Sequence, residues 1–248
     1  MALTISRQTS SKNGPLTTVT TTLAISLASL PTVGQPIVVV AQIWGNGTSQ
    51  DYVTGVTDNQ AGNVYTKVLE SRGSKTGTAG GWPSHYQFLL PKVVGATGTF
   101  TITITFTNTT TNNFWINPTV LEFAGYGTDG AAFDIAKIQA GDLNWQDIAT
   151  GRVNSTTSAI AVAGAILEDS ANNAWSSTGG WTNQNNVPNG TVDAPSSCDT
   201  QILTSSAVRN IFYTRSNSMV GWAGGLVVYR DGPAAALVNG GPIAWTRA

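Results

Sequence analysis

Charged residues are scarce in this sequence. Only 10% of its 248 residues are Asp, Glu, Lys or Arg, whereas globular domains usually carry about 25%. The formal net charge is −1, so we expect no basic surface that would attract nucleic acid or an anionic membrane. Solubility must rest on Thr, Ser, Asn, Gln and Gly, a composition typical of secreted, cell-surface and virion proteins rather than of cytoplasmic enzymes.

Cysteine and long apolar runs are lacking too. Cys198 is the only cysteine, which excludes an internal disulfide. No apolar run approaches the ~20 residues that a membrane-spanning helix needs. The first residues, MALTISRQTSSKNG, contain no basic segment followed by an apolar stretch, so a secretory signal is not expected. Release with a phage particle by lysis, or removal of a signal, would still allow an extracellular location.

An alternation of apolar and polar residues dominates what is present. Its clearest example is GTFTITITF, residues 98–106, where Phe and Ile alternate with Thr without a break. Such a period of two predicts a strand with one face in a core. We expect the threonine face to look toward solvent or a neighbouring subunit. Because an uncharged edge strand invites unwanted pairing, we also expect this strand to be central or covered.

The same pattern predicts an all-β chain of roughly a dozen strands. We expect the others over 3–7, 17–27, 36–44, 52–58, 64–71, 85–90, 118–127, 159–167, 201–206, 209–214 and 221–230, with 131–139 as a strand or a short helix. The continuous apolar run at 36–44 indicates a strand that is covered on both faces or central in a sandwich. Residues 72–84 and 168–198 are predicted to be long loops.

The architecture that fits is two packed antiparallel sheets in a jelly-roll-like sandwich. We expect one domain over residues 1–230, with 1–16 as an alternative N-terminal arm. Residues 231–248 form a C-terminal tail that is too apolar to be fully solvated, and its Leu237, Ile243 and Trp245 are candidates to contact a partner. Docking of the tail on its own domain is the alternative.

Several segments carry a resemblance to known proteins. The order VTGVTDNQAGNVYTKV, HYQFLLPKVVGATGTFTITITF, PTVLEFAGYG, AIAVAGAI and GWAGGLVVYR resembles a family of β-sandwich domains found in phage structural proteins and bacterial surface proteins. The resemblance covers about residues 35–230. It implies a β-sandwich fold and, for function, a structural or surface role without a defined ligand.

Residues that could carry out chemistry are few. His85 is the only histidine, and a nucleophile–histidine–acid set would need it; we expect it on the outer face of its strand and not in catalysis. Cys198 has no evident base partner, so we expect a bystander thiol. The candidate carboxylates for a glycosidase pair are Glu70, Glu122, Glu168 and Asp169. Glu70 and Glu122 come from different predicted strands and could meet across a sheet, but this is the less favoured interpretation.

Asp58 begins the sequence Asp-Asn-Gln-Ala-Gly-Asn. We expect its carboxylate to cap a turn. Binding of calcium with Asn59 and Asn63 is the alternative, but this cluster has too few acids for the six to eight oxygens of such a site. No Cys/His metal spacing or phosphate-binding glycine loop is present, so we predict neither a metal nor a cofactor.

Tryptophan is the informative residue type. Several of the eight tryptophans fall in predicted loops, where they could stack on sugar rings, anchor a protein partner or pin a loop onto the domain. The candidates for contact with a partner or a glycan are Trp82, Trp115, Trp175 and Trp181.

These features together favour a non-enzymatic structural protein of a phage particle, such as a capsid decoration or cement protein, a head fibre or a tail component. Its partners would be further copies of itself and other virion proteins, and its location the virion. The alternative is a carbohydrate-binding or adhesion module of a cell-surface or secreted protein, which binds a glycan through loop tryptophans. An enzyme is the least favoured class.

Overall fold

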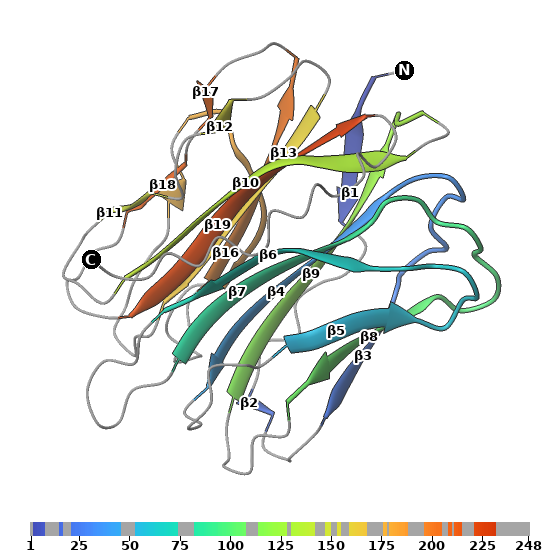
Figure 1. Cartoon of the computed structure of the whole chain (residues 1–248), viewed down its shortest axis with the longest axis horizontal. Coiled ribbons are helices and arrows are strands. Elements are labelled where there is room, and N and C mark those ends of the chain that lie inside the picture. The colour runs from blue at the N-terminus through green and yellow to red at the C-terminus, as the bar shows by residue number, and fades with distance from the viewer. Residues whose placement is uncertain are drawn as a thin grey trace.

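The computed structural model describes residues 2–7, 15–16, 21–45, 53–73, 82–107, 114–127, 130–141, 147–149, 153–154, 159–167, 176–177, 179–187, 196–204, 208–209, 211–214 and 221–231. Every regular element in these ranges is a strand (Figure 1). The strands are β1 (Thr4–Arg7), β2 (Pro15–Leu16), β3 (Thr22–Ser26), β4 (Ile37–Gly45), β5 (Val53–Asp58), β6 (Thr66–Arg72), β7 (Trp82–Leu90), β8 (Thr101–Phe106), β9 (Phe114–Ala124), β10 (Ala131–Gly141), β11 (Asp147–Ala149), β12 (Val153–Asn154), β13 (Ala159–Leu167), β14 (Ser176–Ser177), β15 (Thr182–Val187), β16 (Ser196–Leu203), β17 (Val208–Arg209), β18 (Phe212–Thr214) and β19 (Trp222–Asp231).

Three sheets hold most of these strands. Sheet A has the order β1-β9-β4-β7-β6, with β2 also paired to β9; sheet B has the order β3-β8-β5; sheet C has the order β10-β19-β13-β16-β15. The strand pairs within the three sheets are antiparallel. The smaller pairings are β11-β18-β14 and β12-β17. The prediction of an all-β chain with antiparallel sheets is therefore confirmed.

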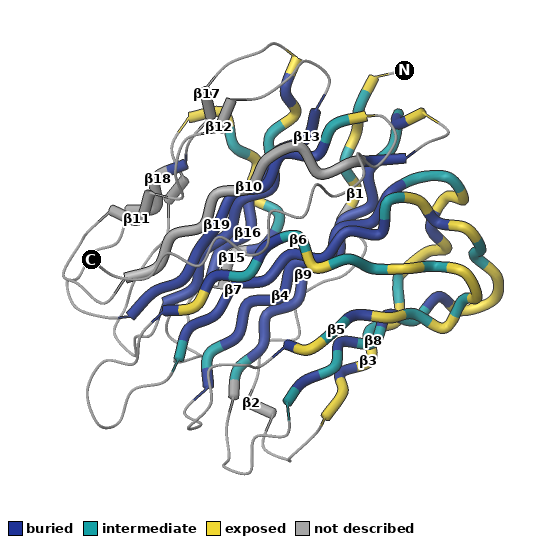
Figure 2. The backbone as a smooth tube through the Cα atoms, viewed as in Figure 1, coloured by how far each residue is buried: buried dark blue, intermediate teal, exposed yellow. Residues whose placement is uncertain are grey.

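Sheet A lies between the other two sheets. One apolar cluster joins one face of β4, β7 and β9 to β3, β5 and β8 of sheet B. A second cluster joins the opposite face of the same strands to β13, β16 and β19 of sheet C. The sandwich thus has a third layer beyond the two sheets expected from the sequence. Figure 2 shows the resulting concentration of buried backbone along β4, β7, β9, β13 and β19.

Strand β4 explains why sheet A is the middle layer. All but one of its residues are buried, and alternate side chains of a strand point to opposite faces. Ile37 and Val39 belong to the cluster with sheet B, whereas Val38 and Val40 belong to the cluster with sheet C. The continuous apolar run predicted to be covered on both faces is indeed covered on both, and it lies at the centre of its sheet.

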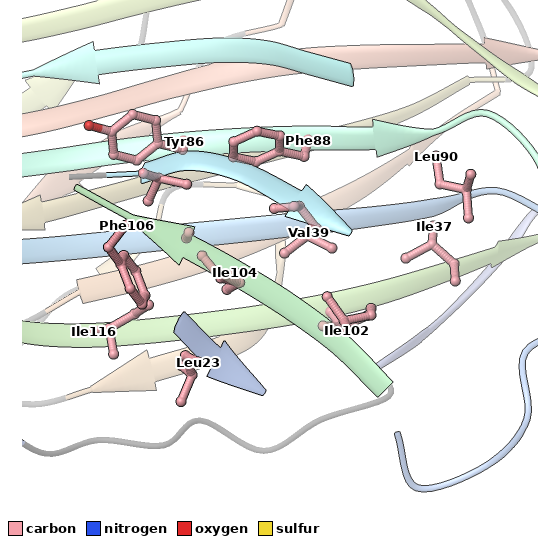
Figure 3. Close-up of a cluster of buried hydrophobic side chains, with 14 of the residues drawn as sticks. Leu23, Ile37, Val39, Tyr86, Phe88, Leu90, Ile102, Ile104, Phe106 and Ile116 are labelled. Carbon is pink, nitrogen blue, oxygen red and sulfur yellow. The ribbon is translucent and has the colours of Figure 1, made fainter. Parts of the chain in front are cut away.

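The strand with alternating threonines is β8, and it is central in sheet B. Its burial alternates residue by residue. Ile102, Ile104 and Phe106 point into the core against β4, β7 and β9 (Figure 3). The predictions of an apolar inner face and a central position are both confirmed.

Other sequence predictions have clear outcomes. Residues 131–139 lie in strand β10 and not in a helix. Of the two predicted long loops, 168–198 contains β14, β15 and the start of β16, and 72–84 contains the start of β7. The jelly-roll connection pattern and the limits of the domain remain predictions. The apolar tail 232–248 lies outside the described residues. Within the described ranges no helix is long and apolar enough to span a membrane.

Candidate functional site

Buried polar side chains gather between sheets A and C. We call this group the polar layer. Its members from sheet A come from the centre of β4, β7 and β9, and those from sheet C come from β15, β16 and β19. They are Gln42, His85, Gln87, Asn117, Thr119, Asn185, Ser196 and Tyr229, all of them 5% exposed or less. Because burial of polar groups is costly unless they are hydrogen-bonded, their bonds define what the layer can do.

Gln42 ties β4 to two strands of sheet C. Its Nε2 donates to the carbonyl oxygens of Ala165 at 3.0 Å and Ser197 at 2.7 Å. Its Oε1 accepts a bond from Nδ2 of Asn117 at 3.4 Å. Asn117 also donates to Oγ of Ser196 at 2.5 Å. The side chains of sheet A therefore satisfy backbone and hydroxyl groups of sheet C and fix how the two sheets sit on each other.

The Asn185 side chain donates hydrogen bonds from sheet C to sheet A. Its Nδ2 donates to Oδ1 of Asn117 at 2.8 Å and to Oγ1 of Thr119 at 3.0 Å. Asn185 belongs to β15, the edge strand of sheet C. The amide chain from Gln42 through Asn117 to Asn185 thus crosses the interface and holds an edge strand.

His85 lies at the other end of the layer, beside Gln87. Nε2 of Gln87 donates to the Val162 carbonyl oxygen and lies 3.2 Å from Nε2 of His85, while its Oε1 accepts a 2.8 Å bond from the Tyr229 hydroxyl. Because the amide nitrogen is the donor to His85, Nε2 of the imidazole must be the acceptor. The ring proton is then assigned to Nδ1, which has no hydrogen-bond partner among the described residues.

The expectation that His85 lies on an outer face is wrong. His85 is fully buried, because sheet C covers the face of β7 that a two-sheet sandwich would leave open. Burial lowers the pKa of His85 from 6.5 to about 3, since the charged imidazole loses its hydration there. The imidazole is therefore neutral at physiological pH, and no carboxylate of the described residues is hydrogen-bonded to it as in a catalytic triad.

Glu70 and Glu122 do not form a catalytic pair, and the other two candidates, Glu168 and Asp169, lie outside the described residues. Glu70 lies on β6 and Glu122 on β9, and β4 and β7 separate these strands in sheet A. Glu70 forms ion pairs with Lys67 and Arg72. Glu122 accepts a 2.7 Å bond from the backbone N–H of Thr32. Both groups are engaged in holding local structure.

Asp58 caps its turn, as predicted. Its carboxylate accepts bonds from the Gln60 N–H at 2.8 Å, from Nδ2 of Asn63 at 2.9 Å and from the Tyr65 hydroxyl at 2.9 Å. Asn63 presents its amide nitrogen to the carboxylate, so it is a hydrogen-bond donor here and not a cation ligand. In the described ranges no group of three or more His, Cys, Asp or Glu side chains is placed to hold a metal. Cys198 is buried in the cluster between sheets A and C.

The tryptophans predicted to contact a partner or a glycan lie in different parts of the structure. Trp82 and Trp115 lie in strands β7 and β9, not in loops as expected. Trp82 packs on the cluster between sheets A and B, Trp115 packs near Ile166 between sheets A and C, and Trp181 packs on a cluster that includes the outward-facing alanines of β13. All three are half-buried, and each packs on a different cluster. Trp175, Leu237, Ile243 and Trp245 lie outside the described residues.

The outer side of sheet B carries no charged side chain among the described residues. The residues that alternate with its core residues are small or carry hydroxyl groups, and all of them are exposed or half-buried. We call this surface the hydroxyl face, and it consists of Thr22, Ala24, Ser26, Gly55, Thr57, Thr101, Thr103 and Thr105. Ser26 and Thr101 lie opposite each other with their hydroxyls 3.5 Å apart. Threonine keeps high β propensity there, and its hydroxyl group can both donate and accept a hydrogen bond.

Sequence reasoning predicted the hydroxyl face but missed the polar layer. The only available signal was the group of polar residues at Gln42, His85 and Gln87 inside apolar strands. Such residues within a buried strand indicate contact with another polar surface, because an unpaired polar group would be costly there.

Replacement of Gln42 by leucine tests the polar layer. The variant removes the donor to the Ala165 and Ser197 carbonyls and leaves buried acceptors with one bond fewer. We expect the free energy of unfolding to fall by about 2 kcal/mol, measured by urea denaturation. The conservative Thr57→Ser variant on the hydroxyl face serves as control and should change it by less than about 0.5 kcal/mol. An unchanged midpoint for Gln42→Leu would show that the layer contributes nothing to stability.

Comparison with known proteins leaves the chain without an identified relative: no family model, no curated protein and no solved structure matches it.

Proposed function

We propose that this chain is a non-enzymatic structural protein that acts through protein–protein assembly contacts. The setting we propose is a phage particle, as a capsid decoration protein, a head fibre or a tail component, in line with the resemblance to phage structural domains. The observation that carries the proposal is the hydroxyl face of sheet B. An exposed sheet surface with no charge can meet a neighbouring subunit without the desolvation of charged groups that opposes burial.

The chemistry of the described core supports the same proposal. The polar layer is buried, its histidine is neutral and its amides are bonded to one another or to the backbone. Such a layer holds two sheets in one arrangement and presents no nucleophile or base to a substrate. Carbohydrate binding by tryptophans remains a sequence prediction, because no observation gathers Trp82, Trp115 and Trp181 on one surface.

Sedimentation analysis of the full chain tests the proposal. We expect the mass to rise above the 25.8 kDa of a single chain as the concentration increases from the micromolar to the millimolar range, because subunits of symmetric assemblies associate through repeated weak contacts. A single-chain mass at every concentration would contradict assembly by this chain alone. Mass spectrometry of phage particles purified from the source tests the setting, and absence of the chain from them would refute it.

A further inference from the structure

The edges of sheets A and B differ in how they are protected. Exposed edge strands present unpaired backbone groups, and proteins usually blunt them with charges, prolines or bulges. Strand β6, at one edge of sheet A, carries Lys67, Glu70 and Arg72. Its pairing with β7 also has an irregularity between Lys67 and Leu69. At the other edge, β1 ends in Arg7.

Strand β5, at one edge of sheet B, is protected as well. Its pairing with β8 is irregular between Val53 and Gly55. Nζ of Lys67 donates to the Val53 carbonyl oxygen at 3.4 Å, so a cation from the neighbouring sheet lies on this edge. A further strand could not pair along β5 without displacing that contact.

Strand β3, at the opposite edge of sheet B, has none of these features. Its sequence is TLAIS, its pairing with β8 is regular throughout, and residues 13–50 contain no Asp, Glu, Lys or Arg. Among the described strands only β8 pairs with it. Ile25 and the adjoining Leu27 are only partly buried where they pack on the core.

The backbone geometry of β3 directs hydrogen-bonding groups toward the side away from β8. The Thr21 carbonyl oxygen accepts from Phe106 N–H, and Leu27 N–H donates to the Phe100 carbonyl oxygen, so the odd-numbered residues point toward β8. Backbone groups of successive residues in a strand point to opposite sides. The N–H and C=O groups of Ala24 and Ser26 therefore point away from β8.

The sequence of β3 is complementary to itself. If two copies run antiparallel about a two-fold axis at Ala24, Ala24 lies opposite Ala24 and Leu23 lies opposite Ile25, with Thr22 beside Ser26. Side chains directly opposite each other in an antiparallel pair lie on the same face. Apolar residues would then meet apolar residues on the core side and small or hydroxyl residues would meet on the outer side, with no charge to desolvate.

We propose that β3 pairs with β3 of a second copy of this chain, which joins two sheets B into one continuous sheet with a continuous hydroxyl face. This inference rests on the proposed function and names the partner that the assembly would use. The Ala24 N–H of each copy donates to the Ala24 carbonyl oxygen of the other. A two-fold contact of this kind uses the same patch on both subunits.

The expected contact is weak in isolation. Five residues on each side bury far less than the roughly 800 Å² per partner of a standard stable interface. The dimer should therefore form at high concentration and dissociate on dilution. In an assembly with many copies, further contacts would raise the effective concentration of the paired strands and strengthen the contact.

Two matched lysine variants test the pairing. Ala24 and Thr57 lie on the same face, in register with Thr103 from opposite edges of sheet B. Both are exposed, so either lysine can be accommodated in the single chain. Ala24→Lys places two like charges directly opposite each other at the two-fold axis, and we expect self-association in sedimentation to weaken roughly tenfold or more. Thr57→Lys adds the same charge at the far edge and should associate as the wild type does.

Cross-linking provides a second measurement. The single native cysteine is buried, so Ala24→Cys adds the one accessible thiol. Opposed residues in an antiparallel pair have Cα atoms about 5.5 Å apart, within the range of a disulfide. Mild oxidation at associating concentrations should yield a covalent dimer for Ala24→Cys and little for Thr57→Cys.

The outcomes separate this inference from the proposed function. Association that survives Ala24→Lys, without a cross-link at position 24, would overturn pairing through β3 while leaving assembly through another surface. Equal loss of association in both lysine variants would favour contact through the hydroxyl face. That result would also overturn pairing through β3. A wild-type chain that remains a monomer at every concentration would contradict both proposals.

Discussion

Replacement of Gly164 by alanine is expected to lower the free energy of unfolding by about 3 kcal/mol, a large part of a typical domain's stability. Gly164 lies on β13, where the strand crosses the polar layer. A Cβ atom at this position would lie 2.5 Å from Cε1 of His85, 2.9 Å from Nε2 of Gln42 and 3.1 Å from Nδ1 of His85. The approaches to Cε1 of His85 and Nε2 of Gln42 are shorter than those that Cβ atoms make in proteins, so these neighbours must move.

Movement of those neighbours is costly because both are fully buried and hydrogen-bonded. A shift of Gln42 weakens its bonds to the Ala165 and Ser197 carbonyls, and a shift of the His85 ring weakens its bond to Gln87. The expected loss therefore combines overpacking with disruption of buried hydrogen bonds. Thermal or urea unfolding of the variant would measure it.

Gly55→Ala is the matched control for this prediction. A Cβ atom at Gly55 meets nothing within 4 Å, and the residue lies in edge strand β5. We expect a change within about 0.5 kcal/mol. Equal stability of Gly164→Ala and Gly55→Ala would show that sheets A and C can separate locally to admit a methyl group.

Local alternation predicted the strands well because it is a property of consecutive residues. In β7, the alternation of side chains along a strand predicts one face with the odd-numbered residues and another with the even-numbered ones. These are His85, Gln87 and Leu89 on one face and Tyr86, Phe88 and Leu90 on the other. The clusters confirm that division for the apolar residues, since Leu89 packs toward sheet C whereas Tyr86, Phe88 and Leu90 pack toward sheet B.

The alternation of residues along a strand could not reveal what covers each face. That His85 is buried depends on β13 and β19, which lie far away in the sequence and form a third layer over sheet A. For the same reason the partners of Gln42 could not be foreseen, since Ala165 and Ser197 are 123 and 155 residues away along the chain. Trp82 and Trp115 were misplaced for a local reason. The residues just before them, SKTGTAGG at 74–81 and NTTTNN at 108–113, are small or polar and typical of loops, whereas β7 and β9 begin at Trp82 and Phe114.

Acid is expected to destabilise the fold through His85. The pKa of this buried imidazole is about 3 in the native chain and 6.5 when unfolded. Above pH 6.5 both states hold a neutral ring, and the imidazole adds no pH dependence. Between pH 6.5 and about 3 the unfolded chain takes up a proton that the native chain refuses. The free energy of unfolding therefore falls by about 1.4 kcal/mol for each pH unit in that window, or about 5 kcal/mol in total.

The hydrogen bonds around the ring explain why the native state resists protonation. A charged imidazole carries a proton on both nitrogens, so its Nε2–H would face the amide nitrogen of Gln87, which is already a donor to Val162. The groups linked to the ring by these bonds are Gln87, the Val162 carbonyl and Tyr229. None of them is a carboxylate that could stabilise the charge. Protonation thus requires the polar layer to open, and acid should separate sheets A and C before it disturbs the packing of sheets A and B.

Two measurements test this expectation. His85 is the only histidine of the chain, so its ring resonances in an NMR titration report one site, and they should remain those of a neutral imidazole down to about pH 4. A titration midpoint near 6.5 in the folded protein would contradict the prediction. In urea unfolding between pH 6.5 and 5, where most carboxylates stay ionised, the wild type should lose stability with a slope that rises from about half a proton to nearly one proton. The His85→Gln variant keeps a neutral amide in place of the imidazole and should show a slope close to zero over the same range.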